Sequence, residues 1–165
     1  DDGIKPEIAE VSPQFFKTTF ANYELIASEN DRVFNYENRI YRPFMTDQLL
    51  LKQLMTILFD NAIKYTEEDG KIEFVVHATD RHLYLTVTDN GIGISAPDKK
   101  KIFDRFYRVD KARTRQKGGF GLGLSLAKQI VDALRGTITV KDNKPRGTIF
   151  EVKIAIQSPS KRKNK

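Results

Sequence analysis

The sequence predicts an α/β two-layer sandwich, in which a mixed, largely antiparallel sheet carries three main helices on one face. Three observations indicate this class. Two pairs of β-rich runs are each separated by a short polar turn, as in hairpins. Three further segments place apolar residues at helical spacing. The length of 165 residues suggests a single domain with a sizeable core, which we assign to residues 1–157.

The first elements follow from local signals near the N-terminus. Ser12 and Pro13 are typical of an N-cap and a first helical position, and they predict a helix over residues 13–28. Its apolar face carries aromatic residues at helical spacing: Phe16, Phe20 and Tyr23. Residues 31–37 then predict a strand, and residues 39–43 a short strand or turn.

A second, longer helix is expected after Thr46 and Asp47, which predict its N-cap, and it extends to about Tyr65. Its core stripe is Leu51, Leu54, Leu58 and Ala62. Residues 71–78 and 83–88 are β-rich runs on either side of the sequence TDRH, which predicts a hairpin. Residues 98–106 favour a short helix, and residues 109–117 are polar.

The last third of the chain predicts a third helix and a second hairpin. The helix covers residues 122–135 and ends at Gly136, a typical C-cap residue. Residues 137–141 and 148–156 are expected to be strands joined across the sequence DNKPRG. Residues 158–165, SPSKRKNK, predict a basic, disordered tail.

Composition excludes several kinds of protein. The chain is 39% hydrophobic and 30% charged, which is ordinary for a globular domain. It contains no cysteine, so disulfides and thiolate metal sites are excluded. Its apolar runs fall short of the roughly 18 residues that a membrane span needs. The chain lacks both a signal-peptide pattern and an initial methionine, so we expect it to be a fragment of a longer protein.

The net charge of +6 is concentrated in two places. Residues 98–117 contain nine Lys or Arg and three Asp, and the tail from residue 161 to 165 adds four positive charges. A basic segment beside a glycine-rich loop suggests an anionic ligand. A solvated charged loop is the plainer alternative for the same residues.

The C-terminal half of the second helix presents a polar face. Asn61 lies four residues after Ile57, and Lys64 and Tyr65 follow Asn61 by three and four residues, so they share this face. An amide oxygen suits a hard cation such as Mg²⁺, and a lysine suits phosphate as a point charge. A merely solvated polar face is the alternative.

The sequence DNGIGI suggests a binding loop. Asp89 ends a predicted strand, where its carboxylate can accept hydrogen bonds from an exocyclic amine and so select adenine. Gly91 and Gly93 allow the backbone to approach a flat ring. The alternative is a type I′ hairpin turn, for which Asn-Gly is a strong signal. The following sequence ISAPDKKK favours a helix start over a second strand.

The stretch KGGFGLGLSLAKQIV, residues 117–131, combines four glycines with a helical pattern. Glycines ahead of a helix let backbone N–H groups converge on an anion, with help from the helix dipole. The stretch is not a Walker A loop, because no Gly-Lys-Ser/Thr ends it. It also lacks the preceding buried strand of a dinucleotide fingerprint.

These segments follow one another in a specific order. FDNAIKYT, DNGIGI, KIFDRFYRVD and GGFGLGLSLAKQIV resemble the N, G1, F and G2 boxes of the catalytic, ATP-binding domain of sensor histidine kinases in two-component systems. The resemblance runs from about residue 47 to residue 154. It implies the Bergerat ATP-binding fold, which agrees with the element order above. It also implies an enzyme that transfers the γ-phosphoryl group of MgATP to a histidine on a separate dimerisation domain.

The resemblance implies roles for individual residues. Asn61 would coordinate Mg²⁺, Lys64 would meet phosphate, and Tyr65 would lie near the adenine and ribose. Asp89 would accept from the adenine amino group. Arg108 would reach the terminal phosphate beneath a lid of residues 109–121. The other implied nucleotide-binding residues are Gly91, Gly93, Ile94, Phe103, Phe106, Tyr107, Gly119, Phe120, Gly121, Leu122, Gly123 and Leu124.

Two departures from related patterns narrow the expected activity. Family members often carry Asn four residues before Asn61, where this chain has Ile57. Related ATPases of the gyrase, Hsp90 and mismatch-repair types place a glutamate there to activate water, and isoleucine cannot act as a general base. Neither His77 nor His82 is followed by an acidic residue. The phosphoacceptor histidine is therefore expected outside this chain.

The resemblance further implies a cognate response regulator as partner. It implies a parent protein that is a homodimer anchored in a bacterial cell membrane, with this domain in the cytoplasm and monomeric when isolated. We expect no binding to nucleic acid. The alternatives are a serine-directed kinase or ATPase of the same fold, or a basic nucleic-acid-binding module. The last is suggested by Phe103, Phe106 and Tyr107, which interleave with Lys and Arg.

Overall fold

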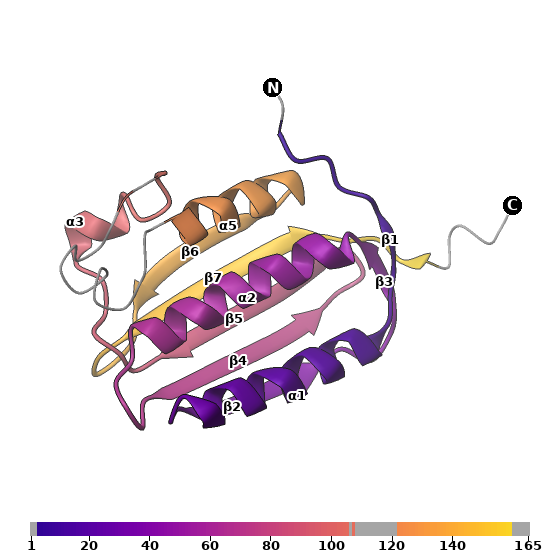
Figure 1. Cartoon of the computed structure of the whole chain (residues 1–165). Helices are drawn as coiled ribbons and strands as arrows, with labels where there is room; N and C mark the ends of the chain where they lie inside the picture. The colour runs from indigo at the N-terminus through magenta and orange to yellow at the C-terminus, as the bar shows by residue number, and fades with distance from the viewer. Residues whose placement is uncertain (1–2, 106, 108–121, 160–165) are drawn as a thin grey trace, which may run out of the picture.

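A five-stranded sheet forms one layer of the molecule, and helices form the other (Figure 1). The computed structural model describes residues 3–105, 107 and 122–159. The strand order is β2 (Val33–Arg39), β4 (Lys71–Ala78), β5 (His82–Asp89), β7 (Thr148–Ala155) and β6 (Thr137–Asp142). β2 pairs with β4 in parallel, and the other neighbours are antiparallel. The predicted two-layer sandwich with a mixed, largely antiparallel sheet is confirmed.

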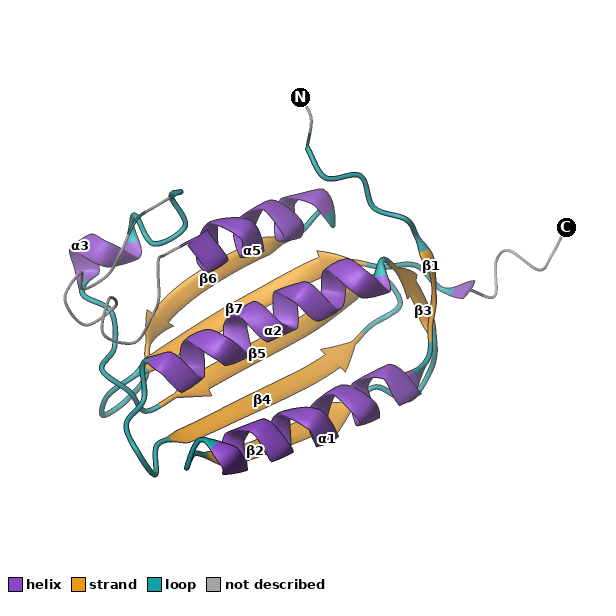
Figure 2. Ribbon diagram, in the orientation of Figure 1, coloured by secondary structure: helices purple, strands orange, loops and turns teal. Residues whose placement is uncertain are grey.

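Three helices lie on the same face of the sheet (Figure 2): α1 (Pro13–Glu29), α2 (Gln48–Lys64) and α5 (Leu122–Ala133). The predicted N-cap of α2 is confirmed, because the Asp47 carboxylate accepts from the Leu50 N–H at 3.0 Å. Its second oxygen accepts from the Glu7 N–H at 2.8 Å, which fastens the N-terminal segment to the start of this helix. Within the described part of the chain, no helix is long and apolar enough to cross a membrane.

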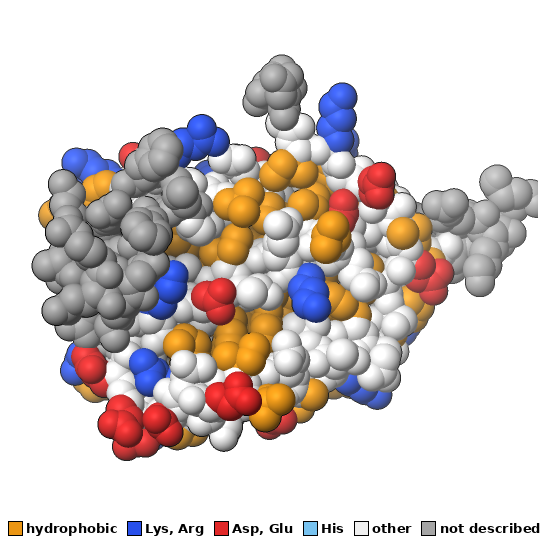
Figure 3. Space-filling view, viewed as in Figure 1, with side chains coloured by type: hydrophobic (Ala, Val, Ile, Leu, Met, Phe, Trp, Pro, Cys, Tyr) orange, Lys and Arg blue, Asp and Glu red, His pale blue; other side chains and the backbone are white. Residues whose placement is uncertain are grey.

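Aromatic side chains fill the layer between α1 and the sheet. Tyr23 stacks on Phe59 of α2 with ring centroids 4.2 Å apart, and its hydroxyl lies 2.8 Å from that of Thr56. Phe20 packs edge-on against Phe74 of β4 at 5.4 Å. The rings predicted for the first helix therefore join α1, α2 and the sheet in one core. Figure 3 shows the helix-bearing side, where hydrophobic side chains remain visible among charged ones of both signs.

Strand alternation decides which side chains of β5 face the helices. Leu83, Leu85, Val87 and Asp89 are buried, whereas the residues between them are partly exposed. Because successive side chains point to opposite faces, Asp89 lies on the helix-covered face together with the three apolar residues. The sheet register thus places a carboxylate at the edge of the hydrophobic core.

A small antiparallel pair of β1 (Ala9–Val11) and β3 (Phe44–Thr46) corrects two expectations. The sequence does not predict β1, and β3 follows directly after the short strand or turn that the sequence predicts at residues 39–43. Pro43 lacks an N–H for a sheet ladder, so pairing begins at the buried Phe44 that follows it. Met45 also forms an isolated bridge with Gln157, beyond the end of β7.

Two predicted helices are shorter in the structure. The helix expected at residues 98–106 is α3 (Ala96–Lys99), whose N-cap Ser95 accepts from the Asp98 N–H. The backbone then continues in turns, with bonds from Lys101 to Asp98 and from Asp104 to Lys101. The helix α5 ends at Ala133 rather than at residue 135, because Arg135 has a φ of +60° and cannot continue it.

Candidate functional site

A narrow cavity lies where the C-terminal ends of α2 and β5 meet the start of α5, at the left-hand end of the sheet in Figure 1. Its volume of about 20 Å³ is close to the room that one water molecule needs. The lining residues are Asn61, Tyr65, Asp89, Gly93, Ile94, Leu124, Thr148 and Phe150. Six of these eight belong to the predicted site and come from three separate motifs. The structure therefore brings the end of the second helix, the DNGIGI loop and the third helix together.

Asp89 is the charged group in the wall of this cavity. Its side chain is only 5% exposed, and its Oδ1 accepts from the Gly91 N–H at 2.8 Å. Burial raises the pKa of this carboxyl from 3.8 to about 6, while hydrogen bonds from the backbone N–H groups of Gly91 and Thr148 act to lower it. At neutral pH the group is therefore largely ionised, and it presents a strong acceptor in a confined space.

The loop after Asp89 packs tightly on the end of α2. The Ile92 N–H donates to the Tyr65 carbonyl at 3.0 Å. A Cβ on Gly91 would lie 1.9 Å from the same carbonyl oxygen, so only glycine fits at this position. Gly93 has a φ of +78°, in the left-handed region. The loop leads into α3 rather than into a strand, so the hairpin alternative for Asn-Gly is wrong.

Asn61 and Ile57 face the first turn of α5. The Asn61 Nδ2 donates to the Ile57 carbonyl at 2.9 Å, which fixes the side chain against its own helix. A Cβ on Gly123 would lie 3.5 Å from Ile57 Cγ2 and 3.9 Å from Asn61 Nδ2. Helix α5 thus approaches α2 closely through Gly123. Ile57 stands at the position where the related ATPases are expected to carry a glutamate, and its side chain lies against Gly123 instead.

Lys64 and Tyr65 complete the end of α2. Lys64 is the last helical residue and is half-buried, and Tyr65 is the C-cap, whose N–H donates to the Asn61 carbonyl at 3.1 Å. Burial raises the pKa of the Asp60 carboxyl, and the nearby Lys64 ammonium opposes that shift. Lys64 directly precedes Tyr65, which lines the cavity, but it is not itself a lining residue.

The predicted residues around α3 fall into two groups. Ile94 lines the cavity, and Phe103 packs edge-on against Phe150 at 6.3 Å. The Tyr107 hydroxyl donates to Asp98, and this bond raises the tyrosine pKa. Other predicted features lie outside the described residues: Phe106, Arg108, Gly119, Phe120, Gly121 and the lid of residues 109–121. Leu122 begins α5, and Leu124 is 6% exposed in the cavity wall.

The sequence reading missed the contribution of the β6–β7 hairpin, residues 143–147. Thr148 lines the cavity because strand register pairs it with Asp89. Asn143 and Arg146 donate to backbone carbonyls of the DNGIGI loop. The sequence DNKPRG by itself predicts only the connection between two strands. A turn signal does not specify the register of β7 against β5, and this register is what places Thr148 beside Asp89.

Comparison with known proteins defines the class. A family model described as "Histidine kinase-, DNA gyrase B-, and HSP90-like ATPase" matches residues 46–158. This chain belongs to that family. Sensor protein CiaH of Streptococcus pneumoniae is 82% identical over 163 residues, which cover 99% of this chain and 37% of CiaH. The chain thus spans little more than a third of the length of that relative.

Solved structures agree with this assignment. The catalytic domain of histidine kinase ThkA matches with a TM-score of 0.77 and 26% identity, over 93% of this chain and 99% of that one. ThkA in complex with the response regulator TrrA matches with a TM-score of 0.74 and 26% identity, over 95% and 44% of the two chains. Full-length ShkA in complex with AMPPNP shares the fold, with a TM-score of 0.78 and 21% identity over 94% and 32%.

The predicted ATP-binding catalytic domain of a sensor histidine kinase is thereby confirmed. These matches favour that assignment over a serine-directed kinase and over a nucleic-acid-binding module.

Proposed function

We propose that this domain binds MgATP with the adenine against Asp89 and donates the γ-phosphoryl group to a histidine on a separate dimerisation domain. The observation that carries the proposal is the buried Asp89 carboxylate in the cavity wall. An ionised acceptor in a confined space discriminates strongly, because leaving it unpaired is costly. Adenine offers an amino group at the position where guanine offers a carbonyl oxygen.

The adenine ring is larger than the space between the described side chains. The cavity of about 20 Å³ holds roughly one water molecule. Entry of the base therefore needs movement of the apolar wall residues Ile94 and Leu124, which come from the α3 side and from α5. We expect nucleotide binding to be coupled to a shift of these two elements relative to β5.

Asn61 is the proposed protein ligand of Mg²⁺. Its NH₂ group bonds the Ile57 carbonyl, so its amide oxygen is the atom suited to a hard cation. Within the described residues, no group of three or more His, Asp or Glu side chains could hold a metal by itself. The cation would therefore depend on phosphate oxygens of the nucleotide for most of its coordination. Mg²⁺ supplies charge neutralisation for the transferred phosphoryl group.

Phosphoryl transfer at this site depends more on positioning the reactants and on neutralising the phosphate charge than on a general base. A neutral imidazole is already a nucleophile, so its unprotonated nitrogen can bond the γ-phosphorus while the bond to the β–γ bridging oxygen breaks and ADP leaves, without prior deprotonation. Lys64, near the end of α2, would offset charge on the phosphates, and Arg108 and the glycine-rich segment remain predicted contributors. Ile57 cannot activate water, which favours phosphoryl transfer over hydrolysis.

The two histidines of the chain lie elsewhere. His77 of β4 stacks on Tyr84 at 4.7 Å, and His82 begins β5 at the end opposite to Asp89. Neither lines the cavity. The acceptor histidine is therefore proposed to belong to a dimerisation domain in the longer protein. A cognate response regulator, a homodimeric parent and attachment to a bacterial membrane with this domain in the cytoplasm complete the proposal.

The selectivity for adenine over guanine nucleotides tests the proposed role of the buried Asp89 carboxylate. Asp89→Asn should reduce MgATP affinity by more than tenfold and abolish the preference for ATP over GTP, measured by titration calorimetry. Asp80→Asn is the matched control, because Asp80 is an exposed aspartate in the β4–β5 turn. Equal loss for both bases would show that Asp89 is structural.

The metal and the acceptor are tested separately. Asn61→Ala should remove the Mg²⁺ dependence of nucleotide binding; unchanged MgATP affinity would refute the metal assignment. In the longer protein, radiolabel from γ-labelled ATP should appear in an acid-labile, base-stable product, as expected of phosphohistidine. An acid-stable product would indicate a hydroxyl acceptor instead.

A further inference from the structure

The β6–β7 hairpin holds the loop that follows Asp89. Asn143 Nδ2 donates to the Asp89 carbonyl at 2.9 Å, and Arg146 Nε donates to the Gly91 carbonyl at 2.7 Å. The partners are 54 and 55 positions apart in the sequence. These bonds therefore join two loops that lie beyond the ends of paired strands.

The same hairpin region reaches α3. Asp142 Oδ1 lies 2.7 Å from Lys99 Nζ, and this ammonium also donates to the Ile94 carbonyl at 2.8 Å. The Lys99 side chain is 21% exposed and that of Asp142 is 62% exposed, so the ammonium is partly shielded from water while its carboxylate partner is not. Because Ile94 lines the cavity, this series of contacts ends at the cavity wall.

Backbone contact makes the attachment close. Gly147 has a φ of +115°, and a Cβ there would lie 1.9 Å from the Asp89 carbonyl oxygen. A Cβ on Gly93 would lie 3.4 Å from the Gly147 carbonyl oxygen. The hairpin and the DNGIGI loop thus touch along their main chains, with no room for an intervening side chain at Gly147.

Gly91 links the hairpin to the cavity wall, because it is hydrogen-bonded both to Arg146 and to Asp89. Its N–H donates to the Asp89 carboxylate, and its carbonyl accepts from Arg146. Its α-carbon is pressed against the Tyr65 carbonyl. A rotation of the Gly91 peptide groups would therefore break the Arg146 bond or release the Asp89 carboxylate. The orientation of that carboxylate depends on a loop held from the hairpin.

We propose that Arg146 and Asn143 are positioning residues for base recognition, which hold the Gly91 loop so that the Asp89 carboxylate keeps the orientation that selects adenine. The proposal rests on the function proposed above. Neither side chain lines the cavity, so both act through Asp89 and Gly91 rather than by touching the base.

Three substitutions at one position separate the hydrogen bond from side-chain packing. Arg146→Ala removes the whole side chain, Arg146→Met keeps an apolar stem without a donor, and Arg146→Lys restores a cationic donor. Arg42→Ala is the matched control, because Arg42 is an exposed arginine between β2 and β3 that pairs with Asp80 at the opposite end of β5. Titration calorimetry on the chain measures the dissociation constants of MgATP and MgGTP for each variant, and thermal unfolding verifies that each variant is folded.

We expect Arg146→Ala and Arg146→Met to weaken MgATP binding about fivefold, the equivalent of one hydrogen bond, while MgGTP binding changes less. Arg146→Lys should recover most of the ATP preference, and Arg42→Ala should match the wild type. Wild-type affinity and base preference in Arg146→Met would overturn the positioning role and leave the proposed function intact. Equal weakening for both bases, without rescue by lysine, would also overturn it. A wild-type chain without ATP preference would instead refute the proposed function itself.

Discussion

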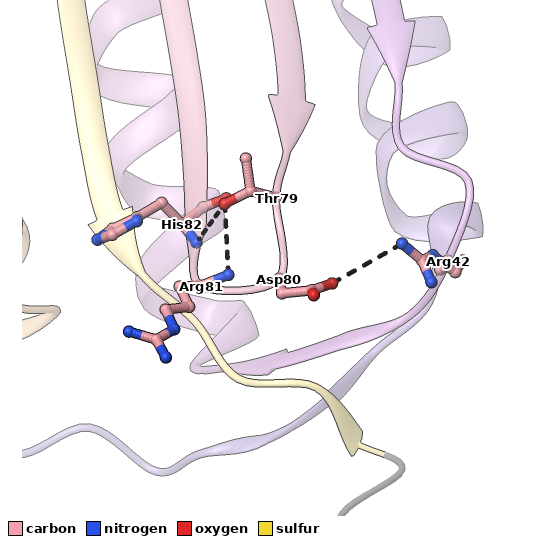
Figure 4. A network of polar contacts seen from close by, with 5 residues as sticks. All are labelled: Arg42, Thr79, Asp80, Arg81 and His82. Carbon is pink, nitrogen blue, oxygen red and sulfur yellow. Dashed lines mark hydrogen bonds and ion pairs between the residues drawn. The ribbon is translucent and has the colours of Figure 1, made fainter.

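The two hairpins at opposite ends of the sheet differ in where their polar side chains find partners. In the β4–β5 turn, the Thr79 hydroxyl accepts from the N–H groups of Arg81 and His82 at 3.3 and 3.1 Å (Figure 4). The one ion pair drawn there joins Arg42 and Asp80 across 3.9 Å, with both side chains more than 80% exposed. In the β6–β7 hairpin, Asn143 and Arg146 bond a loop more than 50 residues earlier.

The β4–β5 turn thus forms its hydrogen bonds internally, whereas the β6–β7 hairpin forms hydrogen bonds that support the candidate site. Bonds within a short turn stabilise that turn and little else. Bonds between distant loops constrain the geometry of both, and here one of the loops carries Asp89. The strands β4 and β7 lie on either side of β5, and their two hairpins lie at opposite ends of β5. The contrast can therefore be tested by paired substitutions at the two ends of β5.

The largest effect is expected from Gly147→Ala. The new Cβ would lie 1.9 Å from the Asp89 carbonyl oxygen, and φ is +115°, so backbone must move. We expect a loss of at least about 3 kcal/mol in the free energy of unfolding, measured by urea denaturation.

Gly123→Ala is the control for Gly147→Ala. Its Cβ would meet only ordinary contacts at 3.5 and 3.9 Å, and alanine favours helix, so stability should stay within about 1 kcal/mol of the wild type. A Gly147→Ala protein as stable as Gly123→Ala would show that the hairpin is not tightly docked.

Asp89→Asn should produce the next largest change, and the change should depend on pH. The folded carboxyl has a pKa of about 6 against an ordinary value of 3.8, so the folded state binds the proton more tightly. The contribution of Asp89 to stability therefore falls as pH rises between about 4 and 6, by about 3 kcal/mol in all.

Removing this charge should stabilise the chain at pH 7. We expect a gain of about 1–3 kcal/mol for Asp89→Asn at pH 7, reduced where the amide NH₂ opposes the Thr148 N–H, and no gain at pH 4. Urea denaturation at both pH values measures it. A gain that is equal at both pH values would contradict the charge explanation. Asp80→Asn, at the other end of β5, should change stability at neither pH.

Asp142→Asn should have a smaller effect with the opposite pH dependence. The hydrogen bond and charge of Lys99 lower the pKa of Asp142 below 3.8, so its stabilisation is present above that pH and is lost as pH falls below about 4. Thermal unfolding at low salt should show a small loss that shrinks at high ionic strength. A loss that is unaffected by salt and by pH would contradict an ionic role for this pair.

Arg42→Ala should have the smallest effect of all. Its partner Asp80 is 3.9 Å away and both side chains are solvent-exposed, so the pair contributes little. We expect thermal stability and nucleotide affinity equal to those of the wild type. A measurable loss of nucleotide affinity would mean that the two ends of β5 are coupled.

The sequence predicted the components of the site better than their connections. Asn61, Asp89 and Leu124 were identified because helical spacing, a strand end and a glycine-rich helix start are local signals, and the cavity brings them together. Arg146 and Asn143 were missed because their partners are backbone carbonyls far away in the chain. Residue type carries no information about such partners, since every residue offers the same carbonyl.

The same reasoning explains the errors in the fold. Strand β1 has only three residues, of which two are exposed and Val11 is buried, so its local pattern is weak and tertiary pairing with β3 determines it. The boundaries of β4 were predicted correctly because an alternating pattern extends over its whole length. Elements that depend on a distant partner are the ones that local patterns cannot define.

The position of β7 has a consequence for synthesis. This strand is the last of the described strands in chain order, yet it lies inside the sheet between β5 and β6 and brings Thr148 to the cavity wall. A ribosome that has released everything up to residue 142 has made Asn61 and Asp89 but not the strand that closes the site beside them. Nucleotide therefore cannot assist the folding of this domain until β7 has emerged, so the nascent domain acquires its ligand only after that strand has paired with β5.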